Sequence, residues 1–178
     1  TTTTSGCTPF EVSFTNQSSA NATSYSWDFG NGETSSEANP IATYTAAGVY
    51  TVTLEVSNAA GMDISTQTNY IEVGVGPTSI FGSSQTATNV SFTNSSSNGE
   101  SYSWDFGNGE SSNEENPTID YMEDGEYEVS LTVTNACGTN TSTETITIVT
   151  APSAGFSTTT TSGCTPFEVS FTNESSDN

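Results

Sequence analysis

The chain has 178 residues and a net charge of −21, because it contains 21 aspartates and glutamates and no lysine, arginine or histidine. No side chain can neutralise phosphate, so the composition excludes nucleic acid and anionic membrane surfaces as partners. No apolar run approaches the roughly 18 residues of a membrane-spanning helix, and we expect no membrane insertion.

The same composition leaves little for catalysis. General acid–base chemistry most often uses histidine, and nucleophiles are commonly activated by histidine or lysine. A carboxylate pair remains formally available, but the acidic residues fall mainly at outward strand positions and in loops, where a solvated surface explains them. We therefore predict no enzyme activity, no catalytic residue and no organic cofactor.

Hydrophobic and polar residues alternate along the chain, and no helical period is sustained, which predicts strands with one buried face. In chain order, the clearest strands of the first half are FEVSFTN at 10–16, YSWDF at 25–29 and VYTVTLEVS at 49–57. Their predicted core residues include Trp27, Tyr50 and Leu54. Short strands punctuated by Gly, Asn and Pro are typical of an all-β sandwich.

The strand-and-turn sequence SYSWDFGNGE at 24–33 recurs letter for letter at 101–110, an offset of 77 residues. The offset continues beyond these ten residues and places Trp104, Tyr127 and Leu131 in a second core. Asn-Gly suits the positive φ angles of a tight turn. We interpret the repeated sequence as a core strand and its turn, in which the carboxylate of Asp28 accepts hydrogen bonds from turn amides.

A second repeat is longer. TTTTSGCTPFEVSFTN occurs at 1–16 and again at 158–173, an offset of 157 residues or about two domains. We predict one domain over 1–75, a second over 76–151, and a linker with the first strand of the next repeat over 152–178. We expect this last segment not to fold alone, because an isolated strand leaves its backbone groups unpaired.

Both copies of WDFGNGE, followed by an Asn-Pro pair, an aromatic and G-x-Y-x-V-x-L-x-V-x-N, closely resemble the PKD (polycystic-kidney-disease repeat) domain. The resemblance implies tandem immunoglobulin-like β-sandwiches in an extracellular or cell-surface protein. PKD domains occur in surface layers, in adhesins and as spacers in secreted enzymes. The sequence departs from the family at Asn31 and Asn108, where Asp is more usual.

Calcium is the metal that the sequence could best accommodate, since it binds carboxylate, amide and carbonyl oxygens. The chain has no complete calcium-loop signature, and the turn already explains the Asn-Gly pair. Zinc is disfavoured, because the three cysteines are far apart. The calcium candidates are Asp28, Asn31, Glu33, Asp105, Asn108 and Glu110.

The cysteines suggest a disulfide, because Cys164 is the copy of Cys7 and each repeat unit therefore owns two, Cys7 and Cys137. In domains that resemble these, a cysteine before the first strand can bond one in the NACG turn of the same domain, but Ala60 and Gln85 stand at the two partner positions. We place Cys137 at the end of its domain where the chain enters and Cys164 at the far end, too distant for a bond. We therefore expect Cys137 to bond an equivalent of Cys7 or Cys164 in a neighbouring unit or chain; free buried thiols are the alternative.

Two functions remain open. The first is a structural repeat unit of a long extracellular filament or stalk, whose partner is the protein itself. The second is a spacer, adhesive or carbohydrate-binding module of a large secreted adhesin or hydrolase, with polysaccharide as the partner. The predicted inward position of nearly every aromatic residue favours the first.

Overall fold

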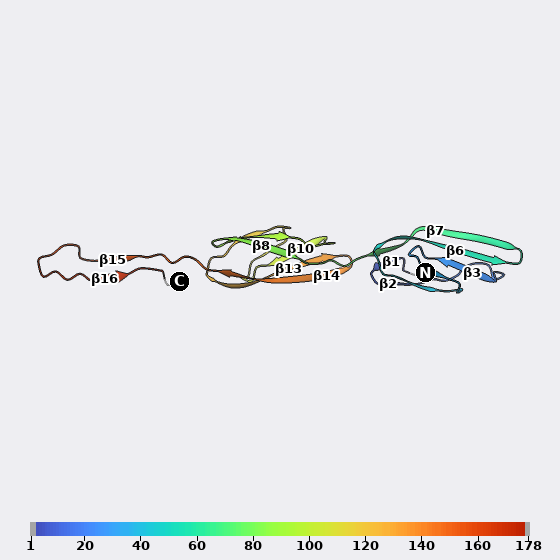
Figure 1. Cartoon of the computed structure of the whole chain (residues 1–178), viewed down its shortest axis with the longest axis horizontal. Coiled ribbons are helices and arrows are strands. Elements are labelled where there is room, and N and C mark those ends of the chain that lie inside the picture. The colour runs from blue at the N-terminus through green and yellow to red at the C-terminus, as the bar shows by residue number, and fades with distance from the viewer. Residues whose placement is uncertain (1–2, 177–178) are drawn as a thin grey trace. The chain divides into compact units, whose positions relative to one another are not determined.

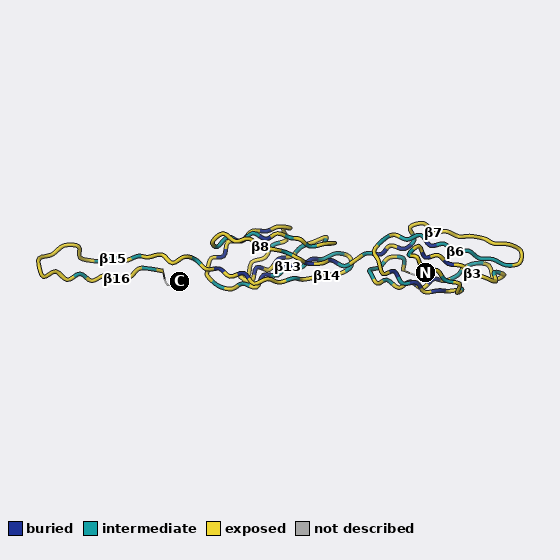
Figure 2. The backbone as a smooth tube through the Cα atoms, viewed as in Figure 1, coloured by how far each residue is buried: buried dark blue, intermediate teal, exposed yellow. Residues whose placement is uncertain are grey.

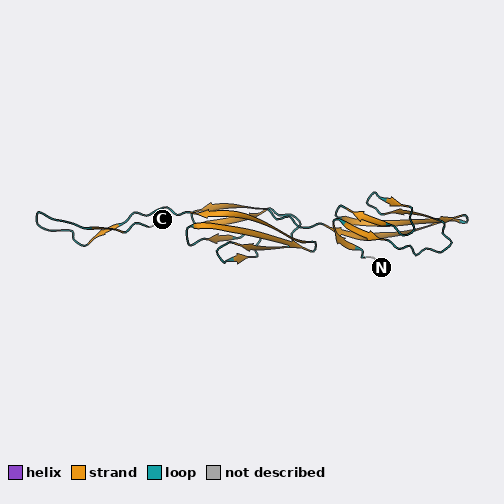
Figure 3. Ribbon diagram, turned by 90° about the horizontal axis from the view of Figure 1, so that it is seen from below, coloured by secondary structure: helices purple, strands orange, loops and turns teal. Residues whose placement is uncertain are grey.

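The computed structural model describes residues 3–176, and every regular element in this range is a β-strand (Figures 1 and 3). The predicted all-β, immunoglobulin-like sandwich class is confirmed. No helix that could cross a membrane occurs in the described part of the chain. Residue contacts divide the chain into unit 1, comprising Thr1–Ser79, Ser96–Ser101 and Thr132–Thr141, and unit 2, comprising Ile80–Ser95, Tyr102–Leu131 and Ser142–Asn178.

The first sandwich has a five-stranded sheet in the order β1-β7-β6-β3-β4 and a two-stranded sheet, β2-β5. Its β1 runs parallel to β7, whereas the other pairs given for this sandwich are antiparallel. The strands are β1 (Ser5–Cys7), β2 (Phe10–Ser13), β3 (Ser24–Asp28), β4 (Thr34–Ser35), β5 (Ile41–Tyr44), β6 (Gly48–Asn58) and β7 (Gly61–Gly74).

The second sandwich has a four-stranded sheet, β11-β10-β13-β14, and a three-stranded sheet, β12-β9-β8. Its first strand, β8, pairs antiparallel with β9 and so differs from β1. The strands are β8 (Phe81–Thr86), β9 (Asn89–Asn94), β10 (Ser101–Asp105), β11 (Ser111–Ser112), β12 (Thr118–Asp120), β13 (Gly125–Asn135) and β14 (Gly138–Ile148).

The repeated tryptophans lie in the two cores. Figure 2 shows that buried stretches occur in each sandwich. Trp27 and Trp104 are buried, and their indole Nε1 atoms donate to the backbone carbonyls of Glu37 and Glu114, at 3.0 and 2.9 Å. Of the other predicted core residues, Leu131 is buried, while Tyr50, Tyr127 and Leu54 are half-buried.

The described part of the last segment, residues 152–176, contains two strands, not one. β15 (Phe156–Thr158), within the stretch expected to be a linker, pairs antiparallel with β16 (Phe171–Asn173). Both phenylalanines are largely exposed, because this hairpin has no second layer of its own to bury them.

Candidate functional site

The two copies of the WDFGNG turn are held by the same hydrogen bonds. The Oδ1 atom of Asp28 accepts from the Gly30 amide at 2.9 Å, and the Oδ1 atom of Asn31 accepts from the Glu33 amide at 2.9 Å. The matching bonds of the second turn, Asp105–Gly107 and Asn108–Glu110, measure 2.9 and 3.0 Å. The carboxylate of Asp28 therefore points away from the core and braces the turn.

Glycine is required at the first turn position for two reasons. Gly30 has φ +75°, and a Cβ there would lie 2.5 Å from the backbone oxygen of Thr51; Gly107 has φ +76° and a contact of 2.6 Å with the oxygen of Glu128. The backbone of β6 or β13 thus packs directly against the turn. This packing explains why both copies have glycine at this position.

The calcium candidates do not form a carboxylate cluster. Within residues 3–176 no group of three or more acidic, histidine or cysteine side chains is placed to hold a metal ion. Asp28 and Asn31 each use an oxygen for the turn, as do Asp105 and Asn108. Glu33 and Glu110 contribute their backbone amides to these bonds. A calcium ion at either turn stays a prediction.

A buried tyrosine ties each turn to the rest of its sandwich. The Tyr44 hydroxyl donates to the Phe29 carbonyl at 3.0 Å, and the Tyr121 hydroxyl donates to the Phe106 carbonyl at 2.9 Å. Burial is the main cause that raises the pKa of both tyrosines to about 12. Nearby Tyr50 or Tyr127 and the turn carboxylates add to the shift, since they also disfavour a phenolate.

The least expected feature is a disulfide within the chain. Cys7 and Cys137 are 130 residues apart in sequence, and their α-carbons lie 5.6 Å apart across the bond. Both belong to unit 1, which contains the N-terminal sandwich and the β13–β14 turn. The expected bond from Cys137 to a neighbouring unit or chain is thus wrong in its partner, which is Cys7 of the same chain.

The parallel pairing of β1 explains this partner. Cys7 lies opposite Gly74, the last residue of β7, so the chain brings an early cysteine to the place where its first sandwich ends. A Cβ at Gly74 would lie 2.7 Å from the Cys137 sulfur, which shows how closely β7 approaches the disulfide. Residues 5–7 are too short and too polar for hydrophobic alternation to reveal this pairing.

The side chain of Asn135 holds the backbone of Cys137, the second cysteine of the disulfide. Its Oδ1 accepts from the Cys137 amide at 2.8 Å, and its Nδ2 donates to the carbonyls of Val75 and Asn98 at 2.9 and 2.7 Å. The Ser79 amide also donates to the Asn140 side chain at 2.9 Å. All of these residues belong to unit 1. The turn that carries Cys137 is therefore fixed by side-chain hydrogen bonds as well as by the disulfide.

Comparison with known families identifies the repeated sandwich. Two segments, residues 1–73 and 74–150, each match the PKD domain. The chain belongs to the PKD domain family. The tandem arrangement indicated by the 77-residue repeat is thereby confirmed.

Similar PKD segments occur in two proteases. The chain is 52% identical over 56 residues to the pre-pro-metalloprotease PrtV of Vibrio cholerae, covering 32% of this chain and 6% of PrtV. It is 53% identical over 51 residues to the collagenase ColA of Clostridium perfringens, covering 28% of this chain and 5% of ColA. The crystal structure of the PrtV PKD1 domain shows 40% identity and a TM-score of 0.39, with 42% of this chain and 98% of that domain covered.

The chain thus spans only about a twentieth of the length of these curated relatives. In this chain the PKD family model covers residues 1–150. This chain is a PKD module. The occurrence of similar segments in these proteases agrees with an extracellular location.

Proposed function

We propose that this chain is a structural repeat unit of a long extracellular or cell-surface filament or stalk built from tandem PKD domains. The observation that carries the proposal is the unchanged return of residues 1–16 at 158–173. A repeat of 157 residues with two different domains in each unit is typical of an array, in which every unit contacts its neighbours.

The Cys7–Cys137 disulfide would help a filament unit to bear tension. When the two ends of the chain are pulled, the load reaches Cys7, crosses the bond to Cys137 and leaves through β14. The chain between the two cysteines cannot be extended while the bond holds, although β1 and β14 also stay hydrogen-bonded to β7 and β13. Such bonds persist in oxidising surroundings, which agrees with an extracellular location.

The proposed partner is the protein itself, as neighbouring units or chains. With a net charge of −21, bare chains repel one another. Salt that shortens the screening length to about 10 Å, or divalent cations between carboxylates, would reduce this repulsion. Lateral association is therefore expected to depend on salt.

The second candidate is a spacer or adhesive module of a large secreted adhesin or hydrolase, with polysaccharide as a partner. The matches to PrtV and ColA favour it. Against it, the tryptophans lie in the cores, and the largely exposed aromatic rings, including those of Phe156 and Phe171, belong to the hairpin at 152–178.

Electron microscopy of the native material separates the two functions. Regular filaments with a repeat matching two PKD domains would support the structural role. Discrete molecules that carry a large terminal domain would overturn it and favour the spacer.

A further inference from the structure

The two sandwiches differ at one sheet edge. In the second, β9 lies between β12 and β8 in a three-stranded sheet; in the first, the matching strand β2 pairs with β5 in a two-stranded sheet. The first sandwich therefore presents, beside β2 and the residues that follow it, an edge at the place that β8 takes in the second.

In the second sandwich, β8 also covers the core. The Phe81 ring lies 5.0 Å from the Trp104 ring and 5.9 Å from the Phe92 ring, measured between centroids, and both contacts are edge-on. Leu131, on the same side of the sheet as Trp104, has no exposed surface. The Phe81 ring of β8 thus packs against both aromatic rings of this part of the core.

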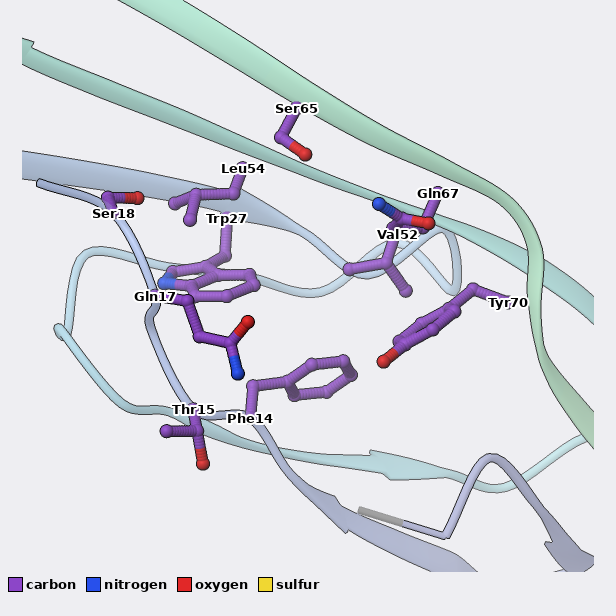
Figure 4. Close-up of a pocket in the computed structure, with 10 residues that line it drawn as sticks. All are labelled: Phe14, Thr15, Gln17, Ser18, Trp27, Val52, Leu54, Ser65, Gln67 and Tyr70. Atoms are coloured by element: carbon purple, nitrogen blue, oxygen red, sulfur yellow. The ribbon is translucent and has the colours of Figure 1, made fainter. Parts of the chain in front are cut away.

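The matching place in the first sandwich is a cavity of about 560 Å³ (Figure 4). Phe14, Trp27 and Leu54 line it, and they are the counterparts of Phe92, Trp104 and Leu131. Leu54 is half-buried where Leu131 is fully buried. Tyr70 and Gln17 also line the cavity, which combines apolar rings with polar side chains such as that of Gln67 (Figure 4).

The chain itself contains a strand of the right kind. In the hairpin of β15 and β16, Phe156 pairs with Asn173 and Thr158 with Phe171, as Phe81 pairs with Asn94 and Ser83 with Phe92 in the second sandwich. The ring centroids of Phe156 and Phe171 are 5.8 Å apart.

The hydrogen bonds beyond this pairing agree as well. The Glu174 amide donates to the Gly155 carbonyl at 2.8 Å, as the Ser95 amide donates to the Ile80 carbonyl at 2.8 Å. β15 therefore has the register of β8 and places its phenylalanine at the same position.

Residues 158–173 repeat residues 1–16, so Phe171 is the copy of Phe14 and Glu174 stands where Gln17 does. We infer that the cavity beside Trp27 binds the strand Gly155–Thr158 of a second copy of this unit, with the Phe156 ring over Trp27. The strand pairs with the backbone at Thr15 and Gln17 in the register of β15 and β16. This inference rests on the proposed function, since an array is what supplies the second copy.

The strand lies in the segment that joins two units, because residues 151–157 directly precede Thr158, the copy of Thr1. Each unit would complete the first sandwich of the next by supplying one strand and one aromatic side chain. Strand addition of this kind gains affinity from backbone hydrogen bonds and specificity from the side-chain pocket.

The test places the sequence of residues 151–157, APSAGFS, immediately before Thr1 of the 178-residue chain. Hydrogen exchange is followed at the Thr15 and Gln17 amides, together with acrylamide quenching of tryptophan fluorescence. A matched variant carries Ser in place of the added Phe. Because burying a phenylalanine is worth about 1.5–3 kcal/mol, exchange at both amides should slow about 10- to 100-fold more with Phe than with Ser.

Acrylamide quenching of tryptophan fluorescence should also decrease only in the Phe version, because the added ring covers Trp27. Trp104 is already covered in every version and contributes no change. Equal exchange with and without the added segment would overturn the inference, and so would equal protection by the Phe and Ser versions. Filaments seen in native material alongside such a result would leave the proposed function standing and remove only the strand assignment.

Discussion

The α-carbons of Cys7 and Cys137 lie 5.6 Å apart although 130 residues separate them in the chain. The bond joins the end of β1 to the β13–β14 turn, within unit 1. Because it closes a loop that contains most of both PKD domains, it restricts the unfolded chain more than a local disulfide would.

Replacing Cys137 by Ser should destabilise unit 1 by about 2–4 kcal/mol, with about 5 kcal/mol as the limit from loop entropy. Calorimetry of the oxidised protein measures the loss as a lower melting temperature. Cys164→Ser is the control, since Cys164 is exposed and unbonded among the described residues. Equal melting of Cys137→Ser and the unchanged chain would contradict the structural role of the bond.

Gly74→Ala should impair the same disulfide without touching sulfur. A Cβ at Gly74 would lie 2.7 Å from the Cys137 sulfur, whereas at Gly76 it would meet nothing within 4 Å. We expect Gly74→Ala to lower the melting temperature and to raise the fraction of free thiol detected under mild reduction, while Gly76→Ala has little effect. Similar thiol titrations for the two variants would count against this packing.

Gly30→Ala should cost more than Gly32→Ala. Both glycines have positive φ, at +75° and +91°, and each alanine pays about 1–2 kcal/mol for this backbone conformation. Only at Gly30 does the Cβ also meet a backbone oxygen, that of Thr51 at 2.5 Å. The further loss should be about 1–3 kcal/mol, as for overpacking. Denaturant unfolding of the pair measures it, and equal losses would show that the turn is not packed against β6.

Because Tyr44 and Tyr121 are buried, we expect the folded protein to lose stability at alkaline pH. Their pKa rises from 10 in the unfolded chain to about 12 in the fold, so the stabilisation is complete below pH 10 and is lost as the pH rises from 10 to 12. Replacing Tyr44 and Tyr121 by Phe should cost about 1 kcal/mol for each hydrogen bond at neutral pH. The double replacement should also make the free energy of unfolding decrease less steeply above pH 10. Unfolding curves with the same pH dependence in both proteins would refute this.

Much of the fold could be predicted because the core strands alternate strictly. Trp27 and Trp104 are buried where the period of two places them, and Asp28 braces its turn as expected. The cysteine partner could not be found in this way. It depends on a parallel pairing between residues 5–7 and the end of β7, a long-range contact without a hydrophobic pattern.

The different pairing partners of β1 and β8 could not be predicted from the sequence either. Both precede a similar FxVSFTN or NVSFTN strand, but β1 joins β7 while β8 joins β9. Register on a sheet edge is set by tertiary pairing, and short polar strands specify it weakly. The cavity beside Trp27 follows from this difference and could not be read from the sequence alone.

Pulling on single chains tests most directly whether this unit is built to carry tension. A chain held at its two ends should, while oxidised, release only the residues outside the Cys7–Cys137 loop. Reduction should add about 450 Å of extension, at about 3.5 Å for each freed residue. The same released length before and after reduction would contradict a load path through the disulfide.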